Sequence, residues 1–219
     1  MFNIVERFVT ISGEAPIIGE PIYLIRFSGC NLLCPYCDTD YKDEINEVIT
    51  VDNLIIEIEN IIKEYPDLKV LFTGGEPLLE ERKEQLYLVM KSLDKIDFFI
   101  ETNGSIEIEH FDLENSHYII DWKTPSSHSS DFFLESNLKK MRFTNDIIKF
   151  VVDKNDLLWV KEKVEFIQKI NPFVKMYISP QYGKITLREI ADFILRNRLP
   201  LNISIQLHKL IWPDKNRGV

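Results

Sequence analysis

The sequence predicts an α/β protein in which parallel strands form a partial, open (β/α) barrel. Three observations support this prediction: short β-rich runs alternate with segments of helical period, polar motifs follow successive runs, and the chain has 219 residues. Such alternation is typical of parallel βα units, whose carboxyl-terminal strand ends carry the active site in a barrel. Because a complete barrel usually takes about 250 residues, we expect an open barrel within a single domain. That domain is expected to cover residues 1–219.

Strands and helices can be assigned in order along the chain. The predicted strands are Ile22–Ser28, Val70–Thr73, Phe98–Glu101, Tyr118–Trp122, Ile147–Val152, Lys175–Ser179 and Leu201–Gln206. In the clearest helix, Leu54, Ile58 and Ile61 recur on one face, charged residues occupy the other, and Pro66 ends the pattern. Further helices are predicted at Glu81–Leu93, Asp131–Lys140, Asn155–Ile170 and Thr186–Arg196.

Composition and charge narrow the class of protein. Lys and Arg number 26 against 35 Asp and Glu, a net charge of -9, which argues against broad binding to a phosphate backbone. The first residues lack a basic segment followed by an apolar one, and the chain has no apolar run long enough to span a bilayer. We therefore expect a cytoplasmic protein whose partners include neither nucleic acid nor membrane.

All three cysteines fall within one short motif, Cys30-x3-Cys34-x2-Cys37, directly after the first predicted strand. Three thiolates at this spacing favour a four-iron cluster with one open iron, where a substrate or cofactor can coordinate. A structural zinc with a histidine as fourth ligand and simple burial are the alternatives. The available histidines lie far from the motif and form no close pair: His110, His117, His128 and His208. A disulfide is disfavoured because the cysteine count is odd.

Polar motifs also follow the next predicted strands. Gly74-Gly75 leaves two positions without side chains, so a ligand can approach the backbone closely and Glu76 can meet an ammonium group. Asn103-Gly104 follows the next predicted strand. Both Gly74-Gly75 and Asn103-Gly104 are also typical of simple turns, which is the alternative to a ligand site.

The cysteine motif and Thr73–Pro77 together resemble the radical S-adenosylmethionine (SAM) superfamily, which implies its partial barrel. Over nearly the whole chain, further motifs resemble the 7-carboxy-7-deazaguanine synthase family. They are Ser12-Gly13-Glu14, Leu24–Phe27, Cys37-Asp38-Thr39, Glu101–Gly104, Asp121–Ser127, Lys149–Val152 and Gln206–Lys209. The resemblance implies conversion of 6-carboxy-5,6,7,8-tetrahydropterin to 7-carboxy-7-deazaguanine with loss of ammonia, a step of queuosine and related 7-deazapurine pathways.

The resemblance also implies the cofactors. Cys30, Cys34 and Cys37 would hold a [4Fe-4S] cluster, whose open iron binds SAM. A radical derived from SAM would abstract hydrogen from C6 of the pterin, and SAM would be regenerated. The Thr39 hydroxyl would bind Mg²⁺, a hard ion that accepts few protein ligands, although a turn or cap residue is the ordinary interpretation of Thr39.

The remaining site assignments follow from the same resemblance. Glu14 would accept hydrogen bonds from the aminopyrimidine edge, and Arg26 would grip the substrate carboxylate unless it is a solvent-facing edge residue. Other implied substrate contacts are Ile11, Ser12, Gly13, Thr73 and the terminal carboxylate of Val219. Implied SAM contacts are Tyr36, Asp38, Gly74, Gly75, Glu76, Asn103, Lys123, Ser126 and Gln181. His208 could contact the substrate or be a core histidine, and the core position is slightly favoured. A flavodoxin- or ferredoxin-type electron donor and a homodimer are the expected partners.

Two departures from the family pattern stand out. Ser12 and Ala15 replace the usual Gln and Gly, so a side-chain amide contact to the pterin is expected to be lost or replaced. Trp122 stands where an aliphatic residue is common, a change expected to concern packing. Another small radical SAM enzyme, such as a glycyl-radical activase, and a non-catalytic iron–sulfur or zinc protein remain the alternatives.

Overall fold

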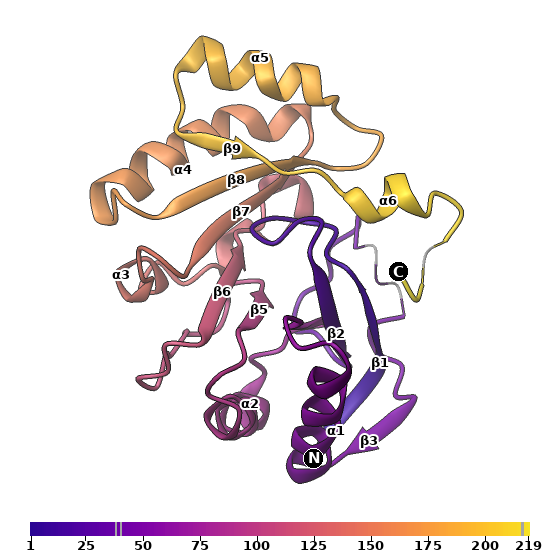
Figure 1. Cartoon of the computed structure of the whole chain (residues 1–219). Coiled ribbons are helices and arrows are strands. Elements are labelled where there is room, and N and C mark those ends of the chain that lie inside the picture. Colours follow the sequence, from indigo (N-terminus) through magenta and orange to yellow (C-terminus); the bar gives the residue numbers. More distant parts are fainter. Residues whose placement is uncertain (38, 40, 216) are drawn as a thin grey trace.

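The protein is built on one nine-stranded sheet that does not close (Figure 1). The structure is a computed structural model that describes residues 1–37, 39, 41–215 and 217–219. Its strand order is β3-β1-β2-β4-β5-β6-β7-β8-β9. Every pair from β2 to β9 is parallel, whereas β1 pairs antiparallel with both β2 and β3. The predicted open α/β barrel is therefore confirmed.

The secondary structure elements have the following bounds. The strands are β1 Phe2–Ile11, β2 Pro21–Phe27, β3 Glu47–Ile49, β4 Lys69–Gly74, β5 Phe98–Thr102, β6 Ser116–Asp121, β7 Ile147–Val152, β8 Lys175–Pro180 and β9 Leu201–Ile203. The helices are α1 Val51–Glu64, α2 Glu80–Ser92, α3 Asn137–Lys140, α4 Leu157–Ile170, α5 Leu187–Asn197 and α6 Leu207–Ile211. Short 3-10 turns cover Pro125–Ser127, Ser130–Phe132 and Lys154–Asp156.

The predicted helix over Asp131–Lys140 is wrong. Only the single turn of α3 and one 3-10 turn form there, because tertiary contacts hold the segment in another conformation. Phe133 stacks on Trp122 with ring centroids 3.8 Å apart. The Asn137 side chain donates to the carbonyls of Gly104 and Ile106 and accepts from the backbone N–H of Ile108. Strands β1 and β3 and helix α6 were not predicted.

Local sequence explains where the better-predicted helices begin. Thr50 caps α1, since its side chain accepts from the backbone N–H of Asn53 at 3.2 Å, and Leu54 and Ile58 are completely buried. Thr186 and Glu189 form a capping box at the start of α5. Among the described residues, no helix is both long and apolar enough to cross a bilayer.

Alternation along the strands gives the sheet two different faces. The helix-covered face carries the main core, which includes Ile25, Phe72, Ile100, Ile120 and Phe150. The other face carries a smaller apolar cluster with Leu24, Leu71, Phe99, Ile119 and Ile147. Two residues further along the same five strands stand Arg26, Thr73, Glu101, Asp121 and Lys149. We call this second row the polar layer, and it lies toward the carboxyl ends of the parallel strands.

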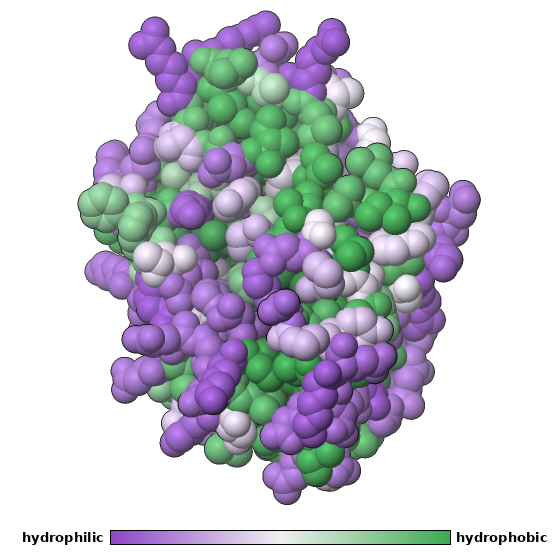
Figure 2. Space-filling model, viewed as in Figure 1, coloured by the Kyte–Doolittle hydropathy of each residue, from purple (hydrophilic) through white to green (hydrophobic). Residues whose placement is uncertain are grey.

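Apolar side chains also reach the surface. Figure 2 shows an apolar area over α5, β9 and α6. The exposed large apolar residues of these elements are Leu187, Leu195, Ile203, Leu210 and Ile211.

Candidate active site

A cavity of about 600 Å³ opens above the polar layer. It brings together most of the residues predicted from the sequence. Those that line it are Ile11, Ser12, Gly13, Glu14, Arg26, Cys30, Cys34, Tyr36, Cys37, Thr39, Thr73, Gly74, Gly75, Asn103, Lys123, Gln181 and Val219. Glu76 and Ser126 do not line it, and Asp38 lies outside the described residues.

The three cysteines sit on the loop between β2 and β3, with their thiols free. A hydrogen bond from Gly29 N–H to the carbonyl of Lys42, 2.8 Å, closes the base of this loop. Cys30 and Cys34 are partly buried and Cys37 is exposed, yet all three line the cavity. This donor set fits a [4Fe-4S] cluster, in which each thiolate binds a different iron. In the described part of the chain, no three His, Cys, Asp or Glu side chains converge as a single metal ion would require.

The glycine pair at the end of β4, Gly74 and Gly75, serves the packing of the chain itself. A Cβ on Gly75 would lie 1.8 Å from the carbonyl oxygen of Gly29, and one on Gly74 would lie 2.3 Å from that of Phe27. Gly74 also has a φ of 126°. The pair therefore lets β4 run against the start of the cysteine loop. The sequence suggested that a ligand approaches these two glycines closely. In the structure, the chain's own backbone makes that close approach.

Glu76 connects the segment after β4 to the end of β5. Its side chain is completely buried and accepts hydrogen bonds from the backbone N–H groups of Leu78 and Asn103 and from the hydroxyl of Thr102, all within 2.9 Å. Burial raises the pKa of the Glu76 carboxyl, and these hydrogen bonds oppose the shift. The sequence suggested that Glu76 could meet an ammonium group. In the structure, the Glu76 carboxylate instead faces the chain's own backbone.

Arg26 enters the cavity from β2. Its Nε donates to Glu6 Oε1 at 2.8 Å and its Nη1 to the Thr39 hydroxyl at 3.3 Å, and its side chain is 14% exposed. The solvent-facing alternative for Arg26 is therefore wrong. Thr39 is buried, with its carbonyl accepting from Lys42 N–H in a turn while its hydroxyl lines the cavity. Thr39 is thus a turn residue whose hydroxyl also reaches the site.

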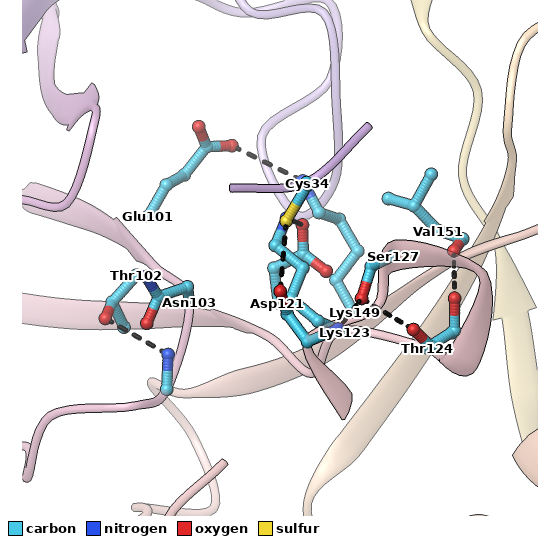
Figure 3. Close-up of polar contacts among 12 residues, drawn as sticks. Cys34, Glu101, Thr102, Asn103, Asp121, Lys123, Thr124, Ser127, Lys149 and Val151 are labelled. Carbon is cyan, nitrogen blue, oxygen red and sulfur yellow. Dashed lines mark hydrogen bonds and ion pairs between the residues drawn. The ribbon is translucent and has the colours of Figure 1, made fainter. Parts of the chain in front are cut away.

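Opposite Arg26, Glu14 meets a lysine that the sequence assignment omitted. Lys149 Nζ lies 2.5 Å from Glu14 Oε2 and 3.8 Å from Glu101 Oε1. Gln206 donates to the other oxygen of Glu14 at 3.2 Å, and Thr73 donates to the other oxygen of Glu101 at 2.8 Å. Figure 3 shows Glu101 and Lys149 reaching toward each other beside Cys34.

A second, partly buried ion pair faces the cysteines. Lys123 Nζ lies 2.7 Å from Asp121 Oδ2. Burial lowers the pKa of Lys123, but attraction to Asp121 outweighs burial and raises it above its ordinary value. The other oxygen of Asp121 is buried without a hydrogen-bond partner among the described residues, so a polar ligand at this position is favoured. Asn103 donates to Asn31 at 3.0 Å and lies 3.9 Å from Cys30 Sγ.

Ser126 stands behind this pair. Its backbone N–H and its hydroxyl both donate to Asp156, at 2.9 and 2.6 Å. Asp156 is buried and also accepts from Thr124. In this structure Ser126 therefore braces the wall of the site.

The loop between β1 and β2 covers one side of the cavity. Gly13 accepts from Leu207 N–H at 2.8 Å, and a Cβ on Gly13 would lie 2.0 Å from His208 Nδ1. His208 is partly buried on α6 and lines the cavity, so the expectation of a core histidine is wrong. Ser12, which stands where the family usually has Gln, donates to the carbonyl of Glu14 at 3.2 Å.

The end of the chain reaches the same cavity. The Arg217 guanidinium lies 3.7 Å from the centre of the Tyr41 ring and 2.5 Å from Glu44. Gly218 N–H donates to Glu6 at 3.3 Å, and Val219 lines the cavity. These contacts hold the terminal residues beside Arg26, through their shared partner Glu6.

The site assignments made from the sequence left out several cavity residues. They include Glu101, Asp121, Lys149 and Gln206, which stood in the family motifs without a role, and Tyr41 and Lys42. For the first three a signal was present, because each stands two positions after an apolar strand residue of the smaller cluster. Side chains two positions apart on a strand share one face, so all three lie on the same face as the apolar cluster and nearer to the strand ends.

Comparison with known proteins relates this chain to one family. A model of the radical SAM superfamily matches residues 24–114, which contain the cysteine loop. The chain is 38% identical to the 7-carboxy-7-deazaguanine synthase of Clostridium acetobutylicum, covering 100% of this chain and 99% of that protein. It is 33% identical to the enzyme of the same name from Thermoplasma acidophilum, covering 96% and 97%. The crystal structure of QueE from Escherichia coli has the same fold, with a TM-score of 0.73 at 22% identity over 94% of this chain and 93% of that one.

Identities of 38% and 33% over nearly the full length establish the family. The chain belongs to the 7-carboxy-7-deazaguanine synthase family of radical SAM enzymes.

Proposed function

We propose that this chain catalyses ring contraction of 6-carboxy-5,6,7,8-tetrahydropterin to 7-carboxy-7-deazaguanine in queuosine or related 7-deazapurine biosynthesis. Loss of one ammonia balances the reaction without a net oxidant. The observation that carries the proposal is one cavity that joins the cysteine loop to a guanidinium and two carboxylates. The names of the full-length relatives support the same activity.

The cofactors follow from the cysteine loop and its surroundings. When bound, the [4Fe-4S] cluster and SAM supply a carbon-centred radical, and Mg²⁺ supplies a hard Lewis acid for substrate oxygens. Cys30, Cys34 and Cys37 would hold the cluster, and Asp121, Lys123 and Asn103 would bind the polar groups of SAM. Thr39 would provide a hydroxyl for Mg²⁺ beside Arg26.

The substrate would occupy the other end of the cavity. Arg26 has the planar fork that binds a carboxylate through two hydrogen bonds. Its present partners, Glu6 and Thr39, hold the guanidinium within the cavity wall. Glu14 would accept from the aminopyrimidine edge. Closure of the terminal residues over Arg26 would exclude water from the reacting centre.

One anaerobic assay tests this function. Purified protein with a reconstituted cluster is mixed with the tetrahydropterin, SAM, Mg²⁺ and a reductant, and the products are separated chromatographically. We expect 7-carboxy-7-deazaguanine and ammonia, with SAM recovered. Cleavage of SAM without any deazaguanine would contradict the substrate assignment and support another radical SAM enzyme. A colourless zinc protein would contradict the whole class.

We also propose a flavodoxin- or ferredoxin-type electron donor and a homodimeric state. The apolar area over α5, β9 and α6 supports self-association, because single exposed residues are ordinary but a contiguous area is typical of an interface (Figure 2). Light scattering after size exclusion would give the mass directly, and a value near the monomer's 25.8 kDa at micromolar concentration would contradict the dimer.

A further inference from the structure

Lys149 is the one charged residue of β7 whose side chain enters the cavity. The residue is 6% exposed. Its ammonium group pairs with carboxylates from two elements, Glu14 from the β1–β2 loop and Glu101 from β5. Asp121, its register neighbour on β6, adds electrostatic attraction. Tyr177 is its register neighbour on β8. Lys149 is therefore surrounded by acceptors on the floor of the site.

A buried ammonium group is costly unless it is paired. Burial by itself lowers the pKa of Lys149, but attraction to Glu14, Glu101 and Asp121 outweighs burial and raises the pKa well above its ordinary value. The group therefore carries its charge at neutral pH. A permanent cation at this position fixes the charge state and the direction of the carboxylates around it.

In both Glu14 and Glu101, each carboxylate oxygen has a partner. Glu14 lies between Lys149 and Gln206, and Glu101 lies between Lys149 and Thr73. The Lys149 ammonium group is the only one of these partners that touches both. Because Glu14 comes from a loop and Lys149 from a strand, the ion pair ties the loop to the rigid sheet.

We propose that Lys149 is a positioning residue for the pterin end of the cavity: it holds Glu14 and Glu101 as a pair of ionised acceptors for the N–H groups of the substrate. The inference rests on the proposed function. An aminopyrimidine edge presents adjacent N–H donors, which ionised carboxylates accept and a protonated carboxyl group cannot fully match. Without Lys149, the two carboxylates would lose the cation that they share, and repulsion between them would favour protonation of one.

The test uses the full chain with its reconstituted cluster and the fluorescent analogue 6-carboxypterin as probe. Lys149→Met keeps the length of the side chain and removes its charge. We expect at least tenfold weaker binding of 6-carboxypterin, with a dissociation constant that rises further as pH falls from 8 to 6. Wild type should vary little across this range. Cluster absorbance and SAM affinity should match wild type, since Lys123 and Asp121 remain.

Two further variants separate positioning from general stability. Lys149→Arg keeps the charge, so it should recover a flat pH profile even where its affinity is lower. Lys83→Met is the matched control, because Lys83 is a partly buried lysine that pairs with Glu109 outside the cavity. It should bind 6-carboxypterin normally at every pH.

A double-mutant cycle shows whether Lys149 acts through Glu14. In the Glu14→Gln background, Lys149→Met should weaken probe binding much less than in wild type. This double variant also removes both charges together, so it should fold even where Lys149→Met alone does not. Independent effects in the cycle, or equal binding and pH profiles for wild type and Lys149→Met, would overturn the role of Lys149. No binding by wild type would instead overturn the proposed function.

Discussion

At the scale of single residues, the site is a set of charges arranged around one cavity. Three cations of the cavity each pair with a carboxylate: Arg26 with Glu6, Lys123 with Asp121 and Lys149 with Glu14. Partly buried pairs of this kind contribute little net stability when complete, but removing one partner leaves an uncompensated charge. Substitutions that keep charge while changing shape are therefore the most informative ones here.

Arg26→Lys keeps the positive charge but replaces a planar fork with a point charge. We expect the affinity for 6-carboxypterin to fall at least tenfold, about 1.4 kcal/mol, measured by fluorescence quenching. Cluster content and SAM affinity should be unchanged. Arg7→Lys is the matched control, because Arg7 also pairs with glutamates, Glu47 and Glu57, but lies outside the cavity. Normal probe affinity in Arg26→Lys would require another group to bind the substrate carboxylate.

Thr39→Ala removes the one hydroxyl assigned to Mg²⁺. Because a single neutral oxygen is a weak ligand, the ion should bind well only when substrate oxygens complete its shell. We expect the variant to need at least tenfold more Mg²⁺ for half-maximal ring contraction, with the cluster and SAM binding intact. Thr39→Ser retains the hydroxyl and should behave like wild type. Identical metal-dependence curves for Thr39→Ala and wild type would limit Thr39 to its turn.

At the scale of elements, close backbone contacts connect the strand ends to the loops that form the site. The β4 end touches the cysteine loop at Gly75, and the β1–β2 loop touches α6 at Gly13. Packing also explains the departure at Trp122, whose buried ring stacks on Phe133 and meets Trp159 edge-on at 5.8 Å. Trp122 lies in the main core on the helix-covered face, away from the cavity.

The two glycine contacts predict different responses to alanine. In Gly75→Ala the new Cβ meets backbone atoms that cannot rotate away, so we expect a loss of about 2 kcal/mol or more in unfolding free energy and weaker cluster binding. In Gly13→Ala the Cβ meets the His208 ring, a side chain that can move. Adding His208→Ala should therefore restore much of the stability lost in Gly13→Ala. Chemical denaturation measures both, and a neutral Gly75→Ala would contradict the contact.

At the scale of the whole molecule, stability and chemistry occupy different parts of the fold. The main core lies between the sheet and its helices, and the smaller apolar cluster fills the opposite face below the polar layer. The cysteine loop belongs to neither cluster. We therefore expect the site to be altered without unfolding the sheet.

The cysteines test this separation. Replacing Cys30, Cys34 and Cys37 together by Ala should abolish the iron–sulfur absorbance and SAM cleavage. The unfolding free energy of this variant should stay within about 1 kcal/mol of cluster-free wild type, because the thiols pack in neither apolar cluster. Calorimetry on both cluster-free proteins makes the comparison. Retained SAM cleavage would defeat the assignment, and global unfolding would show that the loop is part of the folding core.

Sequence patterns alone were enough to predict the βα order, the cysteine loop and the strand ends that carry the site. These features are local: helical periodicity, β-rich runs and motif spacing are visible within a few residues. Strand β1 escaped prediction because its antiparallel pairing with β2 lies outside the βα pattern. Other contacts became visible in the folded chain alone. Lys149 meets Glu14 across 135 positions of sequence, and Glu76 faces backbone while Arg26 faces the cavity. Such contacts depend on strand register and sheet curvature, which bring distant residues together and leave no local signal.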